Sequence, residues 1–121
     1  MTKESGVLGE DVAAYYLADK GYVIRTRNYS CRFGEIDIIA EQGNYLCFVE
    51  VKTRGDRAFG QPAEWVTTEK QRKLIKTANY YIAVHGKEIR ERNLQPRFDC
   101  IEVFLDHQRL PCNLTNIKNA F

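Results

Sequence analysis

At 121 residues, with 44% hydrophobic and 28% charged residues, the chain has the length and composition of one globular domain, which we predict over residues 1–121. No apolar run approaches the roughly 20 residues that span a bilayer, and residues 1–6 lack the basic and then apolar layout of a secretory signal. We therefore expect a cytoplasmic protein with no membrane partner. The formal net charge of +2 does not by itself indicate a nucleic-acid-binding protein, so that function depends on where the charges cluster.

Apolar residues recur at helical spacing in two segments of the chain. The first segment, residues 5–20, is predicted as a helix with Ser5 as its N-cap and Gly21 as its stop. The second predicted helix begins at Thr68, the first residue of a capping-box pattern, and it ends before Gly86. Both helices carry an apolar stripe, so each is expected to cover a sheet or another helix.

Segments rich in Ile, Val and aromatic residues, bounded by turn residues, are predicted as strands. There are four of them: residues 22–27, 35–41, 45–52 and 97–105. The remaining internal segments are predicted as loops: residues 28–34, 53–67 and 87–95. The tail, residues 110–121, is not assigned. This order of elements predicts an α/β fold in which helices cover a central mixed β-sheet.

Two of the predicted strands form the clearest hairpin in the sequence, because Gly43 and Asn44 are typical of a two-residue turn. The register that follows from this turn makes three cross-strand pairs: Ile39 with Phe48, Asp37 with Glu50, and Glu35 with Lys52. Side chains that lie directly opposite on one face have Cβ atoms about 4.5–5.5 Å apart. Asp37 and Glu50 are therefore predicted to lie close enough to bind one cation, with Lys52 alongside on the same face.

Two bare carboxylates at this distance repel each other, and a cation between them relieves the repulsion. A hard, oxygen-ligated ion such as Mg²⁺ or Mn²⁺ does so while both acids stay ionised. Lys52 is placed to steady charge that develops on a phosphate. The alternative is an ordinary water-exposed sheet face crossed by salt bridges. Apolar neighbours on the same face, Ile39 and Phe48, indicate instead that the face is largely covered.

Two further acids can each be interpreted in two ways. Glu10 lies at the edge of the apolar arc of the first helix, so it could be a further ligand of the site. It could equally be a solvent-exposed acid favoured by the helix dipole. Glu35 could belong to the site or form a structural cross-strand pair with Lys52. The residue pattern leaves both alternatives open.

Basic residues cluster around the predicted hairpin site. Six of them lie in the long loop and at the start of the second helix, where they could follow a phosphate backbone: Arg54, Arg57, Lys70, Arg72, Lys73 and Lys76. Lys70 lies in the first helical turn, where backbone amides and the helix dipole also favour phosphate. Phe59 and Trp65 in the same loop could stack on bases, but the favoured interpretation is that they pin the loop to the domain.

Two stretches, GEIDIIA at residues 34–40 and FVEVKTR at residues 48–54, resemble the YraN family of small bacterial proteins. That family is similar in turn to the archaeal Holliday-junction resolvases and to the restriction-endonuclease-like superfamily, whose site has the pattern D…E-x-K. The resemblance extends over nearly the whole chain, including Gly9-Glu10, Phe59-Gly60, Lys70 and residues 119–121. The combined pattern is specific to this family, whereas an E-x-K pattern alone would be weak evidence of the resemblance.

The resemblance implies a restriction-endonuclease-like three-layer core and a metal-dependent endonuclease that hydrolyses phosphodiester bonds of DNA. By position, Asp37, Glu50 and Glu10 match the metal-binding acids, and Lys52 matches the catalytic lysine. The implied cofactor is Mg²⁺ or Mn²⁺, with a metal-activated water attacking phosphorus in line. Because the resolvases act as dimers on branched DNA, a structured DNA substrate and a homodimer are also expected.

Two other functions compete with a nuclease. A catalytically silent nucleic-acid-binding module could keep the same fold, although the presence of all the acids and of Lys52 argues against it. A general acid–base enzyme such as a glycosidase could use the pair of Asp37 and Glu50. For that enzyme the lysine and the basic loop are poorly matched, because they fit a phosphate better than a sugar.

Overall fold

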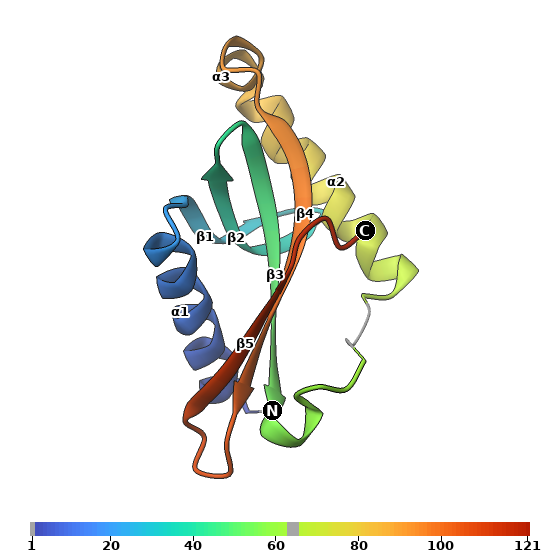
Figure 1. Ribbon diagram of the computed structural model, residues 1–121. Coiled ribbons are helices and arrows are strands. Elements are labelled where there is room, and N and C mark those ends of the chain that lie inside the picture. Colours follow the sequence, from blue (N-terminus) through green and yellow to red (C-terminus); the bar gives the residue numbers. More distant parts are fainter. Residues whose placement is uncertain (1, 63–65) are drawn as a thin grey trace.

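One mixed sheet with helices on both faces makes up the fold (Figure 1). The structure is a computed structural model and describes residues 2–62 and 66–121. The strands lie side by side in chain order: β1 (Val23–Cys31), β2 (Gly34–Gln42), β3 (Tyr45–Gly55), β4 (Gln95–Leu105) and β5 (Pro111–Ile117). β3 and β4 are parallel, and the other neighbours are antiparallel. The predicted α/β fold with a mixed sheet is confirmed.

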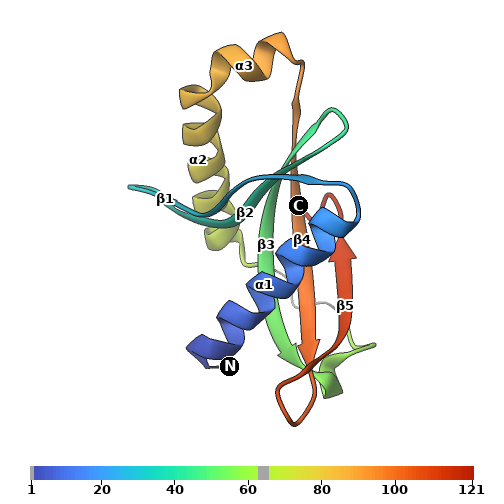
Figure 2. The ribbon, with the colours of Figure 1, turned by 90° about the vertical axis from the view of Figure 1, so that its left-hand side faces the viewer.

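The two long helices lie on opposite faces of the sheet (Figures 1 and 2). α1 (Lys3–Asp19) packs on the face that carries Ile38 and Val49, and α2 (Thr68–Val84) packs on the face that carries Ile39 and Phe48. Neighbouring residues of one strand thus face different helices, as the alternation of strand side chains requires. Burial of apolar side chains in both layers is the main contribution that stabilises the sheet. No helix among residues 2–62 and 66–121 is long and apolar enough to cross a membrane.

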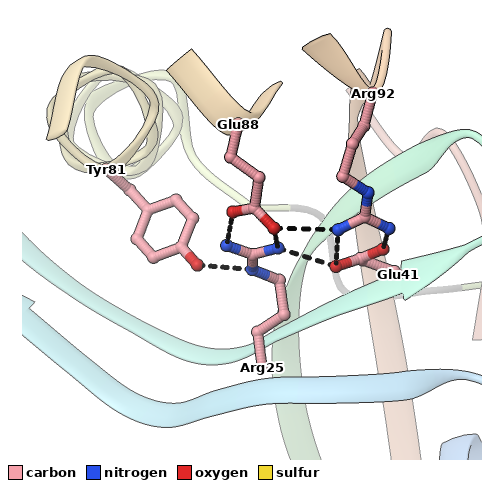
Figure 3. A network of polar contacts seen from close by, with 5 residues as sticks. All are labelled: Arg25, Glu41, Tyr81, Glu88 and Arg92. Atoms are coloured by element: carbon pink, nitrogen blue, oxygen red, sulfur yellow. Dashed lines mark hydrogen bonds and ion pairs between the residues drawn. The ribbon is translucent and has the colours of Figure 1, made fainter. Parts of the chain in front are cut away.

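A cluster of charged residues, the arginine–glutamate network, attaches α3 (Gly86–Glu91) and the end of α2 to the first two strands (Figure 3). Arg25 donates from Nε to the Tyr81 hydroxyl at 2.6 Å, from Nη1 to Glu41 at 2.7 Å and from Nη2 to Glu88 at 2.6 Å. Arg92 donates to Glu41 and, at 2.9 Å, to Glu88. Every charged member of the network therefore contacts two of opposite charge.

The predicted helix starts need correction. Ser5 is not the N-cap of α1, because Thr2 takes that place and its side chain accepts a hydrogen bond from the Ser5 amide at 3.1 Å. Thr68 is likewise the first helical residue of α2 rather than its cap, which is Thr67. Gly21 follows the end of α1 with a φ of +89°, so the predicted stop is confirmed.

Three segments predicted as loops or left unassigned contain regular structure. Residues 28–34 mostly extend the first hairpin, and the strand continues through Asn28 because asparagine tolerates a φ of +53°. Residues 87–95 include most of α3, whose Ile89 is 8% exposed and joins the core under α2. The tail forms β5, which pairs with β4. The long loop also begins later than predicted, because β3 runs to Gly55 and is followed by a short 3-10 helix, Asp56–Ala58.

Candidate active site

The predicted hairpin register is confirmed near the turn and fails beyond it. Ile39 faces Phe48, as expected. The described ladder ends one pair further on, and Glu35 lies opposite Ser30 of β1 rather than opposite Lys52, so the predicted Glu35–Lys52 pair was wrong. β2 stays paired with β1 while it leaves β3, and the two halves of the sheet separate (Figures 1 and 2).

A cavity of about 220 Å³, the acid cavity, lies between the separating strands and the start of α2. Its lining residues are Gly34, Glu35, Asp37, Glu50, Lys70, Lys73 and Leu74. The two predicted metal-binding acids of the hairpin thus line one cavity, as expected from the turn. The Asp37 carboxylate also accepts a hydrogen bond from the Val51 amide of β3 at 2.8 Å, so this side chain joins the strands where the backbone ladder has ended.

The electrostatics of the acid cavity disfavour two ionised carboxylates. Glu50 is only 7% exposed. Burial, and after it the neighbouring Glu50 carboxylate, raise the pKa of Asp37 to about 7, although the hydrogen bond from Val51 acts in the opposite direction. Near neutral pH the Asp37 carboxyl is therefore poised between its two forms. A cation in the cavity would favour the ionised form.

Lys70 brings a positive charge into contact with the acids of the cavity. It lies in the first turn of α2, where its backbone amide donates to the Thr67 hydroxyl at 3.2 Å. Its ammonium forms an ion pair with Glu50. Burial alone would lower the pKa of Lys70, but the hydrogen bond to Glu50 and the nearby Asp37 carboxylate outweigh burial and raise it. The sequence indicated Lys70 as a phosphate contact and gave no signal of this partner, because the contact depends on how α2 packs on the sheet.

Glu10 approaches the acids from the other face of the sheet. α1 lies very close to β3 at Gly9, where an added Cβ would collide with the Thr53 hydroxyl. Burial raises the pKa of Glu10, and the carboxylate of Glu50 contributes in the same direction, so the acids sense one another. Among residues 2–62 and 66–121, however, no three His, Cys, Asp or Glu side chains are grouped closely enough to hold one metal ion. Glu10 is thus an electrostatic neighbour of Asp37 and Glu50 without forming a three-acid group with them.

Four of the six predicted basic residues divide into two groups. Lys70 and Lys73 line the acid cavity. Arg54 instead forms an ion pair with Glu102 at 2.6 Å, and Arg57 lies exposed in the 3-10 helix. Lys52 lies two residues beyond Glu50 on β3, and therefore on the same face, but it is not among the described residues that line the cavity.

The aromatic residues of the long loop were predicted to pin it. The Phe59 ring meets the Phe104 ring of β4 edge-on at 5.2 Å between centroids, which agrees with that interpretation. Phe59 is nevertheless 48% exposed. Trp65, the other aromatic residue in the prediction, lies outside the described residues.

The donors in the acid cavity suit a hard divalent cation. Asp37 and Glu50 offer oxygen ligands only, and Mg²⁺ is commonly held by one or two carboxylates while it keeps several waters. Because burial and Glu50 raise the pKa of Asp37, a cation bound beside this carboxylate would stabilise its ionised form. The residues therefore fit Mg²⁺ or Mn²⁺, with Asp37 and Glu50 as the side chains that would hold the ion.

Residues 9–103, which include the three acids that line the cavity, match the family described as "Uncharacterised protein family UPF0102". The chain belongs to the UPF0102 family. A UPF0102 protein of Caldanaerobacter subterraneus subsp. tengcongensis is 47% identical over 120 residues, covering 98% of this chain and 95% of the relative. A UPF0102 protein of Clostridium acetobutylicum is 45% identical over 121 residues, covering 100% of this chain and 96% of the relative. The expected membership of the YraN-type family is thereby confirmed, since the likeness to UPF0102 proteins covers the full chain.

Proposed function

We propose that this UPF0102 protein is a metal-dependent endonuclease that hydrolyses phosphodiester bonds of DNA on a restriction-endonuclease-like core. The observation that carries the proposal is the acid cavity itself. Asp37 and Glu50, with Glu35 nearby, line one small opening at the point where two strands separate, and lysines of α2 line it too. A cavity with paired oxygen ligands and nearby ammonium groups suits a metal ion and the phosphate that the ion would polarise.

Each residue has a role in this mechanism. Asp37 and Glu50 would hold Mg²⁺ or Mn²⁺, which supplies a Lewis acid for the phosphate and lowers the pKa of a water. Lys52, on the same face as Glu50, would steady charge on the phosphate oxygens as the bond to phosphorus breaks. Lys70 and Lys73 at the cavity would attract the DNA backbone. The nearby carboxylate of Glu10 would add negative charge that favours a bound cation at the acid pair.

The second candidate function is a silent nucleic-acid-binding module with the same fold. The ion pair between Lys70 and Glu50 favours it, because a resident ammonium can neutralise one acid of the pair without any metal. The raised pKa of Asp37 favours the nuclease, because this neutralisation is incomplete. With either function, the protein would bind DNA mainly through contacts to the phosphate backbone.

Calorimetric titration with Mn²⁺, together with cleavage assays on linear, flapped and four-way DNA, tests the proposal. In Asp37→Asn we expect Mn²⁺ affinity to fall at least about tenfold and cleavage to fall about a hundredfold or more. Lys52→Ala should keep Mn²⁺ binding and lose cleavage. Asp19→Asn, which removes an exposed carboxylate at the end of α1, is the matched control and should change neither.

Three results separate the candidate functions. Mn²⁺ binding that survives Asp37→Asn would disprove the metal site. Cleavage that is unchanged in both Asp37→Asn and Lys52→Ala would identify a contaminating nuclease. DNA binding without cleavage of any substrate would favour the silent module.

A further inference from the structure

The tip of the β1–β2 hairpin carries side chains that the acid cavity does not use. Arg32 and Phe33 form the two-residue turn between the strands. The Phe33 ring meets the Tyr80 ring of α2 edge-on, with 6.1 Å between centroids, and the guanidinium carbon of Arg32 lies 4.8 Å from the centre of the Phe33 ring. These three residues, the hairpin–helix cluster, combine two aromatic rings with one positive charge.

The hairpin–helix cluster remains accessible at the surface. Tyr80 is 41% exposed, Arg32 is exposed and Phe33 is half-buried. Tyr81, the next residue on α2, differs sharply, since it is 4% exposed and its hydroxyl accepts a hydrogen bond from Arg25. Packing thus accounts for Tyr81 but leaves part of the Tyr80 ring open. An open ring beside a cation is the combination that proteins use to stack on unpaired nucleobases.

Gly34 connects the hairpin–helix cluster to the acid cavity. It directly follows Phe33 in the chain, and it lines the cavity together with Asp37. Its φ of +149° is one that residues with a side chain rarely adopt, and an added Cβ would lie 3.2 Å from the hydroxyl oxygen of the buried Thr77 on α2. The hairpin tip is therefore seated directly on α2, with Gly34 at the cavity and Phe33 against Tyr80.

α2 also connects the acid cavity to the hairpin–helix cluster. Lys73 lines the acid cavity, and Tyr80 follows seven residues later, close to two full helical turns. Residues at this spacing lie on one side of a helix, and at 1.5 Å per residue they are about 10 Å apart along its axis. A nucleotide that flanks the phosphate at the cavity would lie within this range.

We propose that Tyr80 stacks on an unpaired nucleobase of a DNA strand whose neighbouring phosphate lies at the acid cavity. Phe33 holds the edge of the Tyr80 ring, and Arg32 neutralises a backbone phosphate beside it. The inference rests on the proposed function, because the cavity sets where the strand lies. A base within a continuous duplex has both faces covered by its neighbours, so the cluster selects DNA that has a bulged, flapped or frayed nucleotide next to the phosphate.

Equilibrium binding of DNA that carries one 2-aminopurine tests this inference, with the fluorescent base either bulged or paired in a continuous duplex. The chains carry Lys52→Ala so that the DNA stays intact. In Tyr80→Leu we expect binding of the bulged DNA to weaken about tenfold, whereas binding of the continuous duplex changes by less than about twofold. Tyr80→Phe keeps the ring and should restore the preference. Tyr15→Leu, which removes a tyrosine that is 76% exposed on α1, is the matched control.

Each alternative result has a definite meaning. The stacking site is overturned if Tyr80→Leu weakens the binding of both DNA forms equally or weakens neither. It is also overturned if the parent chain does not bind DNA. Tyr80→Leu could weaken the binding of bulged DNA although the wild type neither binds Mn²⁺ nor cleaves DNA. In that case the stacking site stands and the nuclease proposal fails. If cleavage depends on Asp37 but the preference for bulged DNA survives Tyr80→Leu, the nuclease stands and the stacking site is overturned.

Discussion

Two clusters of charged side chains lie on the α2 side of the sheet, and they differ in charge balance rather than in composition. The arginine–glutamate network contains two arginines and two glutamates, and each contacts both partners of opposite sign (Figure 3). The acid cavity is lined by Glu35, Asp37 and Glu50, and the ammonium of Lys70 forms an ion pair with Glu50. The charges of the first cluster balance, whereas the lining of the second has three acids and two lysines, Lys70 and Lys73.

The pKa values follow this difference in balance. Hydrogen bonds from Arg92 and Arg25 hold the pKa of Glu41 below its usual range despite burial, which means that the network stabilises the ionised acid. In the acid cavity, burial and Glu50 raise the pKa of Asp37 to about 7, which means that the fold destabilises the ionised acid. Carboxylates that lower the stability of a fold are typical of functional sites, where the binding of a ligand offsets the cost.

The largest effect that we expect is on the network. Glu41→Gln should destabilise the protein by about 2–3 kcal/mol, because Arg25, whose side chain is 14% exposed, loses one of its two acidic partners in a largely buried position. Urea unfolding at neutral pH measures this change. The effect should shrink as the pH falls through the lowered pKa of Glu41, since protonation then removes the same charge from the wild type. A loss of stability that is the same at all pH values would show that packing, not charge, is involved.

Asp37→Asn should change the free energy of unfolding in the opposite direction, by a somewhat smaller amount. Since the folded state raises the pKa of Asp37 to about 7, it binds a proton that the unfolded state has lost, so wild-type stability falls as the pH rises from about 4 to about 7. The asparagine is uncharged and keeps an oxygen for the Val51 amide, so it should stabilise the metal-free protein by about 1–2 kcal/mol at pH 8 and by almost nothing at pH 4. Urea unfolding in the presence of a chelator, at both pH values, measures this difference. Destabilisation at pH 8 would contradict the idea that the acid cavity lacks positive charge.

The central features of the acid cavity could be predicted from the sequence because they follow from a local pattern. The turn at Gly43 sets the register of the hairpin, and the register brings Asp37 and Glu50 to one opening. The same count failed for Glu35, because strands twist and β2 follows β1 away from β3. Nothing in the local pattern of β2 marks the residue at which its ladder with β3 ends.

Features that depend on packing between distant segments were not predictable from the pattern. The contact of Lys70 with Glu50 requires the position of α2 on the sheet, and the contact of Phe33 with Tyr80 requires the same position. Most of α3 was predicted as a loop because residues 87–95 are strongly charged, yet Ile89 anchors the helix in the core. β5 was left unassigned because its stability comes from pairing with β4, which a propensity pattern does not reveal.

The smallest effect that we expect concerns the ammonium of Lys70, which forms an ion pair with Glu50. We expect a cation held between Asp37 and Glu50 to displace Lys70 from Glu50, so that the free energy of that ion pair is subtracted from the free energy of metal binding. The Lys70 side chain is 47% exposed, and pairs that are this exposed contribute at most about 1 kcal/mol, which corresponds to about a fivefold change in affinity. Lys70→Met should therefore bind Mn²⁺ about fivefold more tightly in calorimetric titration. Lys73→Met is the matched control, because Lys73 lines the same cavity but its ammonium lies 3.9 Å from the exposed Glu69 instead. Equal or weaker Mn²⁺ binding in Lys70→Met would mean that Lys70 does not compete with the metal, and that the acid cavity can take a cation without losing the ion pair.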